Sequence, residues 1–236
     1  MKLTEQRLKQ IIKESLEDEH KEKLLMLFKS GDHQYAIELS KQVGMEDFLV
    51  GANLSKDNLS EANLSGANLR GTYLRKANLR KANLIKANLI KANLEGADLR
   101  EANLEGANLE AANLEAAYLS QANLKDADLS HADLEEIDLR ETNLEGANLE
   151  DANLTLAYMS RANLRNVNLR NADLTRADQY GVDLRGADLY GTDLRGAYLQ
   201  GANLQGANLQ GANLQGANLK NVKYDKDTVW PQGFTL

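Results

Sequence analysis

The stretch Gly51-Ala52-Asn53-Leu54-Ser55 opens a five-residue phrase that runs in one unbroken frame to about Lys220 and still reads Gly201-Ala202-Asn203-Leu204-Gln205 near its end. Leucine stands at every fifth position from Leu54 to Leu219, and only Met159 and Gln179 interrupt that column over about 34 repeats. An α-helix repeats every 3.6 residues and a strand every two, so neither keeps these leucines on one side. The chain must therefore turn once in every repeat.

A backbone that turns every five residues winds into a four-sided coil of about 20 residues, and successive coils stack at the ~4.8 Å spacing of paired strands. We expect the leucine and the alanine two residues before it to point inward, because these positions stay apolar or small. The Asn or Asp between them is expected at the corner, since short polar side chains bond to nearby backbone in turns, and glycine relieves strain at the repeat boundary. Alanine is replaced in this column mostly by compact residues, among them Thr72, Thr142, Thr192, Val167, Val182 and Ile137.

The tandem Ala-Asn/Asp-Leu phrase resembles the pentapeptide-repeat family over about 170 of the 236 residues. That resemblance implies a mainly β fold, a right-handed quadrilateral β-solenoid, and the helical N-terminal segment resembles that of cyanobacterial members. It implies less about function. Some members are similar enough to DNA to bind gyrase, others are cyanobacterial regulators, and most have no established role.

Three segments are predicted, of which the first, residues 1–47, is helical. Its apolar residues fall into three groups, Leu3 to Leu16, Leu24 to Phe28, and Ala36 to Val43, with Gly31 and Gly44 as helix ends. A solenoid usually covers its terminal coils, so a cap over the array in residues 48–220 is expected. The alternative is a partner-binding or dimerising helical module.

The third segment, residues 221–236, holds the only tryptophan and the only proline of the chain. It resembles the terminal segment that follows many pentapeptide arrays, on Tyr224, Asp225, Thr228, Trp230, Pro231, Gly233 and Phe234. Its apolar side chains are predicted to fold over the last coil, with a dimer contact as the alternative. The chain is thus expected to be a monomer or a homodimer through a terminal cap.

Composition favours a cytoplasmic protein that is not an enzyme. The formal net charge is −7, no apolar run approaches the ~18 residues of a membrane span, and the first residues lack the apolar core of a signal peptide. With no cysteine, disulfides, catalytic thiols and thiolate metal sites are excluded. His20, His33 and His131 lie far apart, and the many carboxylates are expected to point into water, which leaves none with the raised pKa of a catalytic acid. We therefore predict no catalytic residue, cofactor or metal.

Irregularities gather on one face when residues twenty apart are stacked. The Asn/Asp column there reads Tyr118, Asp138, Tyr158, Asp178 and Tyr198, and Met159, Gln179 and Ile137 belong to the same face. One interpretation is local repacking, with tyrosine at a roomy corner and methionine at the volume of leucine. The other is a binding surface. The Gln179 amide would cost about 1–3 kcal/mol inside an apolar core unless it is partnered.

Charge is banded along the axis. Residues 70–91 carry seven basic side chains and no acid, whereas residues 95–151 carry about sixteen acids against three bases. These bands are either surface charge for solubility or a bipolar binding surface, for which the candidate residues are Glu105, Glu110, Glu145, Arg75, Arg80 and Lys86. Direct nucleic-acid binding is not expected, because the longer band repels phosphate.

The sequence thus predicts a rigid, non-enzymatic solenoid that recognises a protein partner through flat, charge-banded faces. The alternative is a DNA mimic that modulates a topoisomerase such as gyrase, although an acidic band of about three coils, ~14 Å, is short beside a DNA segment. A third possibility is a purely structural role.

Overall fold

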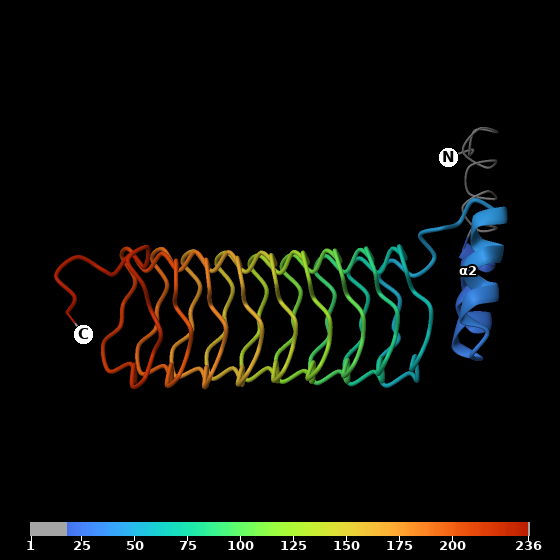
Figure 1. Ribbon diagram of the computed structural model, residues 1–236. Coiled ribbons are helices and arrows are strands. Elements are labelled where there is room, and N and C mark those ends of the chain that lie inside the picture. The colour runs from blue at the N-terminus through green and yellow to red at the C-terminus, as the bar shows by residue number, and fades with distance from the viewer. Residues whose placement is uncertain (1–17, 236) are drawn as a thin grey trace, which may run out of the picture.

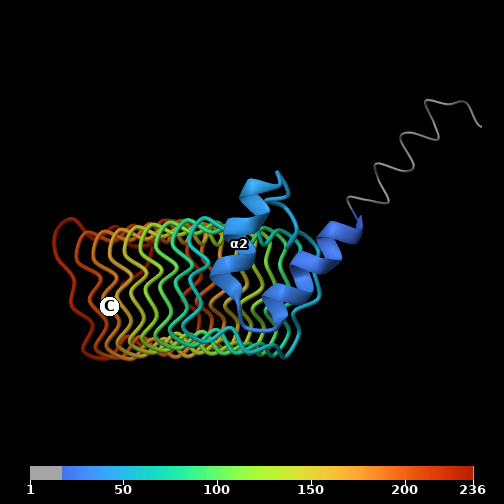
Figure 2. The same cartoon turned by 90° about the vertical axis from the view of Figure 1, so that its right-hand side faces the viewer.

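The computed structural model describes residues 18–235 and consists of four-sided coils stacked in a straight column, with helices at one end and an irregular tail at the other (Figure 1). Each coil advances by twenty residues, since Asn53 pairs in parallel with Tyr73 and Asn58 with Asn78. Figure 2 views the column from its helical end and shows the coils in register behind one another. The predicted β-solenoid with a small helical cap is confirmed.

Each strand is reduced to one bridged residue at the middle of a face. The backbone N–H of Leu104 donates to the carbonyl of Asn123 in the next coil at 2.7 Å, and that of Asn103 donates to Ala82 in the preceding coil at 2.9 Å. This pattern recurs on all four faces, so every coil inside the array is bonded to the coils before and after it.

The corners are formed by the two variable residues after each leucine, which corrects the expectation that Asn and Asp occupy them. The N–H of Ala107 donates back to the carbonyl of Leu104 at 3.0 Å and closes a turn around Glu105 and Gly106, where Gly106 has a φ of 62°. Asn103 lies at mid-face, but its Oδ1 accepts from the corner N–H of Glu105 at 3.2 Å. The side chain therefore stabilises the turn from two residues away, as Asx motifs do.

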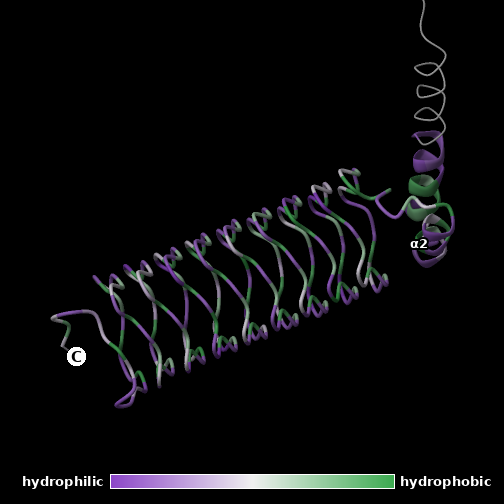
Figure 3. Cartoon of the chain, turned by 90° about the horizontal axis from the view of Figure 1, so that it is seen from above, coloured by the Kyte–Doolittle hydropathy of each residue, from purple (hydrophilic) through white to green (hydrophobic). Residues whose placement is uncertain are grey.

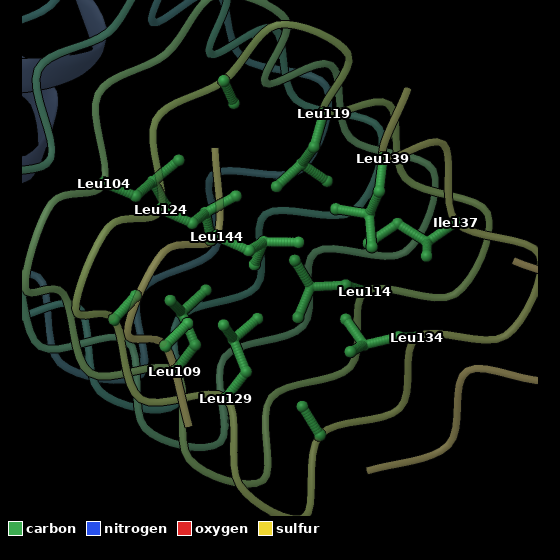
Figure 4. Packing of buried hydrophobic residues seen from close by; sticks show 14 of the residues in the cluster. Leu104, Leu109, Leu114, Leu119, Leu124, Leu129, Leu134, Ile137, Leu139 and Leu144 are labelled. Carbon is green, nitrogen blue, oxygen red and sulfur yellow. The ribbon is translucent and has the colours of Figure 1, made fainter. Parts of the chain in front are cut away.

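The core is a set of leucine and alanine columns, and the prediction that these side chains point inward is confirmed. Figure 4 shows leucines from all four faces converging, among them Leu104, Leu124 and Leu144 stacked in one column. The hydroxyl group of each buried threonine in the alanine column donates a hydrogen bond to the backbone carbonyl twenty-three residues earlier. Thr142 Oγ1, for example, donates to the carbonyl of Leu119 at 2.9 Å. Polar and apolar residues alternate along each coil as a result (Figure 3).

The helical cap comprises a helical segment over 18–29 and α2, His33–Gln42. Phe28 is fully buried, and its ring lies 5.9 Å from that of Phe48, which leads into the first coil. Gly31 and Gly44 end the two helices with φ values of 103° and 69°, as predicted. The helix predicted around Leu3 to Leu16 lies outside the described residues.

One residue of the predicted apolar face of α2 is misplaced. Val43 follows the helix as its C-cap residue and is 51% exposed, whereas Ala36 and Ser40 are buried. The physical reason is that the chain leaves the helix at Val43 before its side chain can reach the first coil.

The tail continues the ladder on two faces before it becomes irregular. The N–H of Val229 donates to Ala207 at 2.9 Å, and Thr228 Oγ1 donates to the carbonyl of Leu204 at 2.9 Å. Beyond it, the rings of Trp230 and Phe234 stack at 5.2 Å. Both rings are partly buried against the hydrophobic core, so the tail packs on the end of the array.

Within residues 18–235, none of the helices has both the length and the apolar character that crossing a membrane requires.

Candidate functional site

The irregular column forms one continuous face, which we call the tyrosine face. Its bridged residues, in order along the axis, are Asn58, Asn78, Asp98, Tyr118, Asp138, Tyr158, Asp178, Tyr198 and Asn218. The structure brings all five predicted ladder residues together on this face. Tyr118, Tyr158 and Tyr198 are 50%, 51% and 56% exposed.

Tyrosine protrudes here because it cannot join the amide ladder that asparagine builds elsewhere. On another face, Asn163 Nδ2 donates to Asn143 Oδ1 at 2.9 Å, and Asn143 Nδ2 donates to Asn123 Oδ1 at 3.0 Å. A phenol ring in that row has no amide to offer to the next coil. It leaves the row and stands in solvent.

Sequence reasoning missed a fourth tyrosine of this face. Tyr180 occupies the first corner position after Gln179 and is 50% exposed. It lies on the coil between those of Tyr158 and Tyr198. The corner positions repeat every twenty residues, as the Asn/Asp column does, so the sequence carries the signal that identifies it.

A groove of about 310 Å³ separates Tyr118 from Tyr158, and Asp138 lies between these two rings along the ladder. Arg140 Nε and Nη2 donate to the two carboxylate oxygens of Asp138, each at 2.8 Å. Burial raises the pKa of Asp138, but the hydrogen bonds and charge of Arg140 outweigh it, so this pKa lies below its usual value. Glu136 also lines the groove and has no ion pair within residues 18–235. The groove is therefore aromatic with a net negative charge.

Asp178 lies between Tyr158 and Tyr198 in the same column. Its Oδ2 accepts from Ser160 Oγ at 2.7 Å, and its Oδ1 accepts from the N–H of Tyr180 at 3.1 Å. No cationic side chain among residues 18–235 forms an ion pair with it.

Beneath the face, Gln179 is completely buried. Neither amide atom, Oε1 nor Nε2, has a hydrogen-bond partner in the part of the chain that the structure describes. Met159 and Ile137 are buried too, and both are apolar, so they fit the core. Among these three residues, the polar irregularity is therefore the glutamine amide; at the capped end of the same face, Asp57 takes an alanine position and its Oδ2 is buried without a hydrogen bond within residues 18–235.

The neighbouring face, which we call the glutamate face, has the bridged residues Asn53, Tyr73, Asn93, Asn113, Asp133, Asn153, Asp173, Asp193 and Asn213. Glu95, Glu115 and Glu135 occupy successive corner positions where this face meets the tyrosine face. Arg75 Nη2 pairs with Glu95 at 2.7 Å. Glu115 and Glu135 have no ion pair within the described residues, so negative charge accumulates beside the tyrosines.

The other predicted acidic residues lie elsewhere. Glu105 and Glu145 follow the ladder residues Asn103 and Asn143 on the face opposite the glutamate face, and Glu110 lies on the fourth face. The structure therefore does not bring Glu105, Glu110 and Glu145 to the tyrosine face.

The basic coil, residues 70–91, is partly neutralised by ion pairs with the acidic band, residues 95–151. Arg80 Nη2 lies 2.6 Å from Glu101 Oε1, in addition to the Arg75–Glu95 pair. Lys86 extends along the axis over the next corner, since a Cβ built on Gly106 would lie 3.5 Å from Lys86 Cγ. Less of this coil is free to meet an acidic partner than the sequence indicated.

The sequence profile of pentapeptide repeats matches eight copies between residues 49 and 223. The chain belongs to the pentapeptide-repeat family. Its solenoid is the right-handed β-solenoid of that family, as the resemblance implied.

Several pentapeptide-repeat proteins of known structure are similar to this chain. Rfr23 from the cyanobacterium Cyanothece 51142 is 43% identical over 39% of this chain, with a TM-score of 0.39, and the match spans 63% of Rfr23. HetL from the cyanobacterium Nostoc sp. strain PCC 7120, a protein involved in heterocyst differentiation regulation, is 33% identical over 80% of this chain and 93% of its own, with a TM-score of 0.38. QnrB1, a plasmid-mediated fluoroquinolone resistance protein, is 20% identical over 75% of this chain and 89% of its own, with a TM-score of 0.40. No curated protein gave a significant match.

This pentapeptide-repeat protein shows no catalytic constellation in residues 18–235. No group of three potential metal ligands gathers there. His131 Nδ1 lies 3.6 Å from Asp151 in an exposed pair, and His33 packs in the cap, 4.7 Å from the ring of Phe28, where burial lowers its pKa.

Proposed function

We propose that this protein is a rigid, non-enzymatic, cytoplasmic scaffold that binds a protein partner through its flat, charge-banded faces. It acts as a monomer or as a homodimer through a terminal cap, and it binds neither membranes nor nucleic acid directly.

The row of half-exposed tyrosines on one flat face carries this proposal. Tyrosine is enriched at protein interfaces, where it supplies a large contact area with few rotatable bonds. Tyr118, Tyr158 and Tyr198 stand where asparagine would close an amide ladder, so each replaces a contact within the array by an exposed ring. An array with a purely structural role gains no stability from replacing a ladder hydrogen bond by an exposed tyrosine ring.

Rigidity makes such a face effective. The ladder on every coil fixes the backbone, and the packed leucine columns fix the interior. A surface that is ordered before binding loses little conformational entropy in the complex.

Charge selects the class of partner. Glu115 and Glu135 form no ion pair with any residue of 18–235 and lie at the edge of the tyrosine face, beside Glu136 in the groove. Carboxylates in this arrangement repel phosphate and attract basic protein surfaces, mostly by raising the association rate and the specificity.

The alternative, a DNA mimic that modulates gyrase, has less support. A mimic presents charge of one sign along its axis. Here Glu105 and Glu145 share their face with Lys125 between them, and Glu110 lies on a different face. Inhibition of gyrase supercoiling by the purified protein, lost on neutralising these three glutamates, would favour the alternative.

Affinity capture from the native organism, followed by titration with the purified partner, tests the proposal. The Tyr158→Ala variant should weaken binding by more than ~1 kcal/mol, about fivefold. Tyr73→Ala is the matched control, because Tyr73 occupies the same ladder position on the glutamate face and is 55% exposed. If no captured protein binds saturably, or if neither variant differs from the wild type, the proposal is wrong.

A further inference from the structure

One face of the protein already shows how its repeats bind a guanidinium group. Arg170 Nη1 donates to Asp188 Oδ2 at 3.0 Å, and Arg170 Cζ lies 4.5 Å from the centroid of the Tyr190 ring. The N–H of Tyr190 donates to the other oxygen, Oδ1, at 3.1 Å. A ladder aspartate followed two residues later by tyrosine thus offers a carboxylate and an aromatic surface to one arginine.

The same arrangement recurs on the tyrosine face without the arginine. The N–H of Tyr180 donates to Asp178 Oδ1 at 3.1 Å, matching the contact of Tyr190 with Asp188. Ser160 stands eighteen residues before Asp178, where Arg170 stands relative to Asp188, and its hydroxyl donates to Asp178 Oδ2 at 2.7 Å. A serine reaches the carboxylate but cannot cover the ring.

Exposure agrees with this difference. Tyr180 is 50% exposed, whereas Tyr190, which lies under Arg170, is 39% exposed. Asp188 also accepts from Asn208 Nδ2 at 3.1 Å, but the residue at the corresponding place beside Asp178 is Tyr198, which has no amide. Asp178 therefore has fewer donors than its counterpart.

Two further tyrosines neighbour Asp178 along the ladder. Tyr158 and Tyr198 pair with Asp178 from the preceding and following coils, each about 4.8 Å away along the axis. Three exposed tyrosines thus lie beside Asp178 in sequence or along the ladder, and Asp178 has no ion pair within residues 18–235, although the charge of Arg140, which pairs with Asp138, also acts on it.

We propose that Asp178, Tyr158, Tyr180 and Tyr198 form a binding site for the arginine side chain of a partner protein. This inference rests on the proposed function, because the partner supplies the arginine. Arg161 and Arg176 are exposed at the corners on either side of the site. The complementary segment therefore carries its arginine between acidic residues, so that a negative charge meets each corner arginine.

Arginine fits this site better than lysine. A guanidinium is planar, pairs with a carboxylate through parallel hydrogen bonds and stacks on aromatic rings, whereas an ammonium is a strongly hydrated point charge. The contacts of Arg170 combine the pairing and the stacking.

Fluorine NMR of the protein labelled with 3-fluorotyrosine tests the site directly, with N-acetylarginine amide as the probe. We expect saturable shifts at Tyr158, Tyr180 and Tyr198 but not at Tyr73, and at least fivefold weaker binding of N-acetyllysine amide. Asp178→Asn should weaken binding about tenfold. An absence of saturable shifts, equal shifts at all tyrosines, equal binding of the lysine probe, or tighter binding of free arginine than of the amide would overturn the proposal.

Ser160→Arg provides a second test, because it should fill the site from within as Arg170 fills its own. The variant should lose N-acetylarginine amide binding and melt at a higher temperature than the wild type. Ser120→Arg is the matched control: it has the same corner position before Asp138, which already holds Arg140, and it should leave binding unchanged. If Ser160→Arg binds the probe like the wild type, the assignment is wrong. If Ser160→Arg does not fold, the test rests on Asp178→Asn, and unchanged probe binding by that variant would overturn the proposal.

The two proposals can fail separately. A captured partner that keeps its full affinity for Ser160→Arg would remove this site from the interface but leave the proposed function standing. If the site binds the probe but no partner protein is captured, the arginine site stands and the proposed function fails.

Discussion

Replacing Gln179 with leucine should stabilise the protein by about 1–3 kcal/mol, the usual cost of a buried amide without partners. The side chain is fully buried, both of its polar atoms lack hydrogen bonds within the described residues, and its column neighbours Met159 and Leu199 are buried and apolar. Leucine fills this position in nearly every other repeat, so the substitution restores the column.

For a chain of this length, each kcal/mol raises the melting temperature by roughly 2–4 °C. Thermal melts and urea titrations should therefore show a rise of about 2–12 °C, with the slope of unfolding free energy against urea unchanged. Gln205→Leu is the control, because Gln205 is exposed in the first corner position and its substitution should change stability by less than ~0.5 kcal/mol. If Gln179→Leu is no more stable than the wild type, the amide is not unsatisfied, and our description of this part of the core is wrong.

Three further predictions concern the core, the end and the cap. Leu104→Asp should lower stability by at least ~3 kcal/mol by placing an unpaired carboxylate among stacked leucines, while Glu105→Gln should be nearly silent; thermal melts in the opposite order would invert the inward and outward assignments. Removing residues 222–236 should uncover the last coil and cause association, so a truncated protein that stays monodisperse in light scattering would contradict a capping role. Burial, with the ring packed against Phe28, lowers the pKa of His33 below its ordinary 6.5. The unfolded chain therefore binds a proton more readily than the folded cap does. The cap keeps its full stability above pH 6.5 and loses stability as the pH falls from 6.5 through the folded pKa. Hydrogen exchange in α2 should accordingly be faster at pH 5.5 than at pH 7.5, after correction for intrinsic rates, and His33→Gln should remove the difference; equal protection of the wild type at both pH values would contradict it.

The period of five was enough to predict the coil, the inward columns and the stacking of Tyr118, Asp138 and Tyr158 on one face. Register alone sets these features, because residues twenty apart must meet. The place of asparagine was predicted wrongly. A residue at mid-face whose side chain reaches the corner has the same period as a residue at the corner itself, so only the hydrogen bonds distinguish them.

The sequence could not predict which residues the long side chains contact. Arg140 pairs with the aspartate of its own coil, whereas Arg170 pairs with Asp188 in the next coil, although both arginines occupy the same position in their repeats. The choice depends on which acceptor the neighbouring coil presents. The sequence did not single out Tyr180 for a related reason, since its significance emerges only beside Asp178 and from comparison with the occupied site of Asp188 and Tyr190 on the opposite face.

Site-specific photo-crosslinking in cells of the native host tests most directly whether the tyrosine face binds a protein. Benzoylphenylalanine is introduced in place of Tyr158 or, as the control, in place of Tyr73 on the glutamate face. The proposed function predicts a discrete crosslinked protein from position 158 that is absent from position 73. No adduct from position 158, or the same set of adducts from both positions, would contradict it.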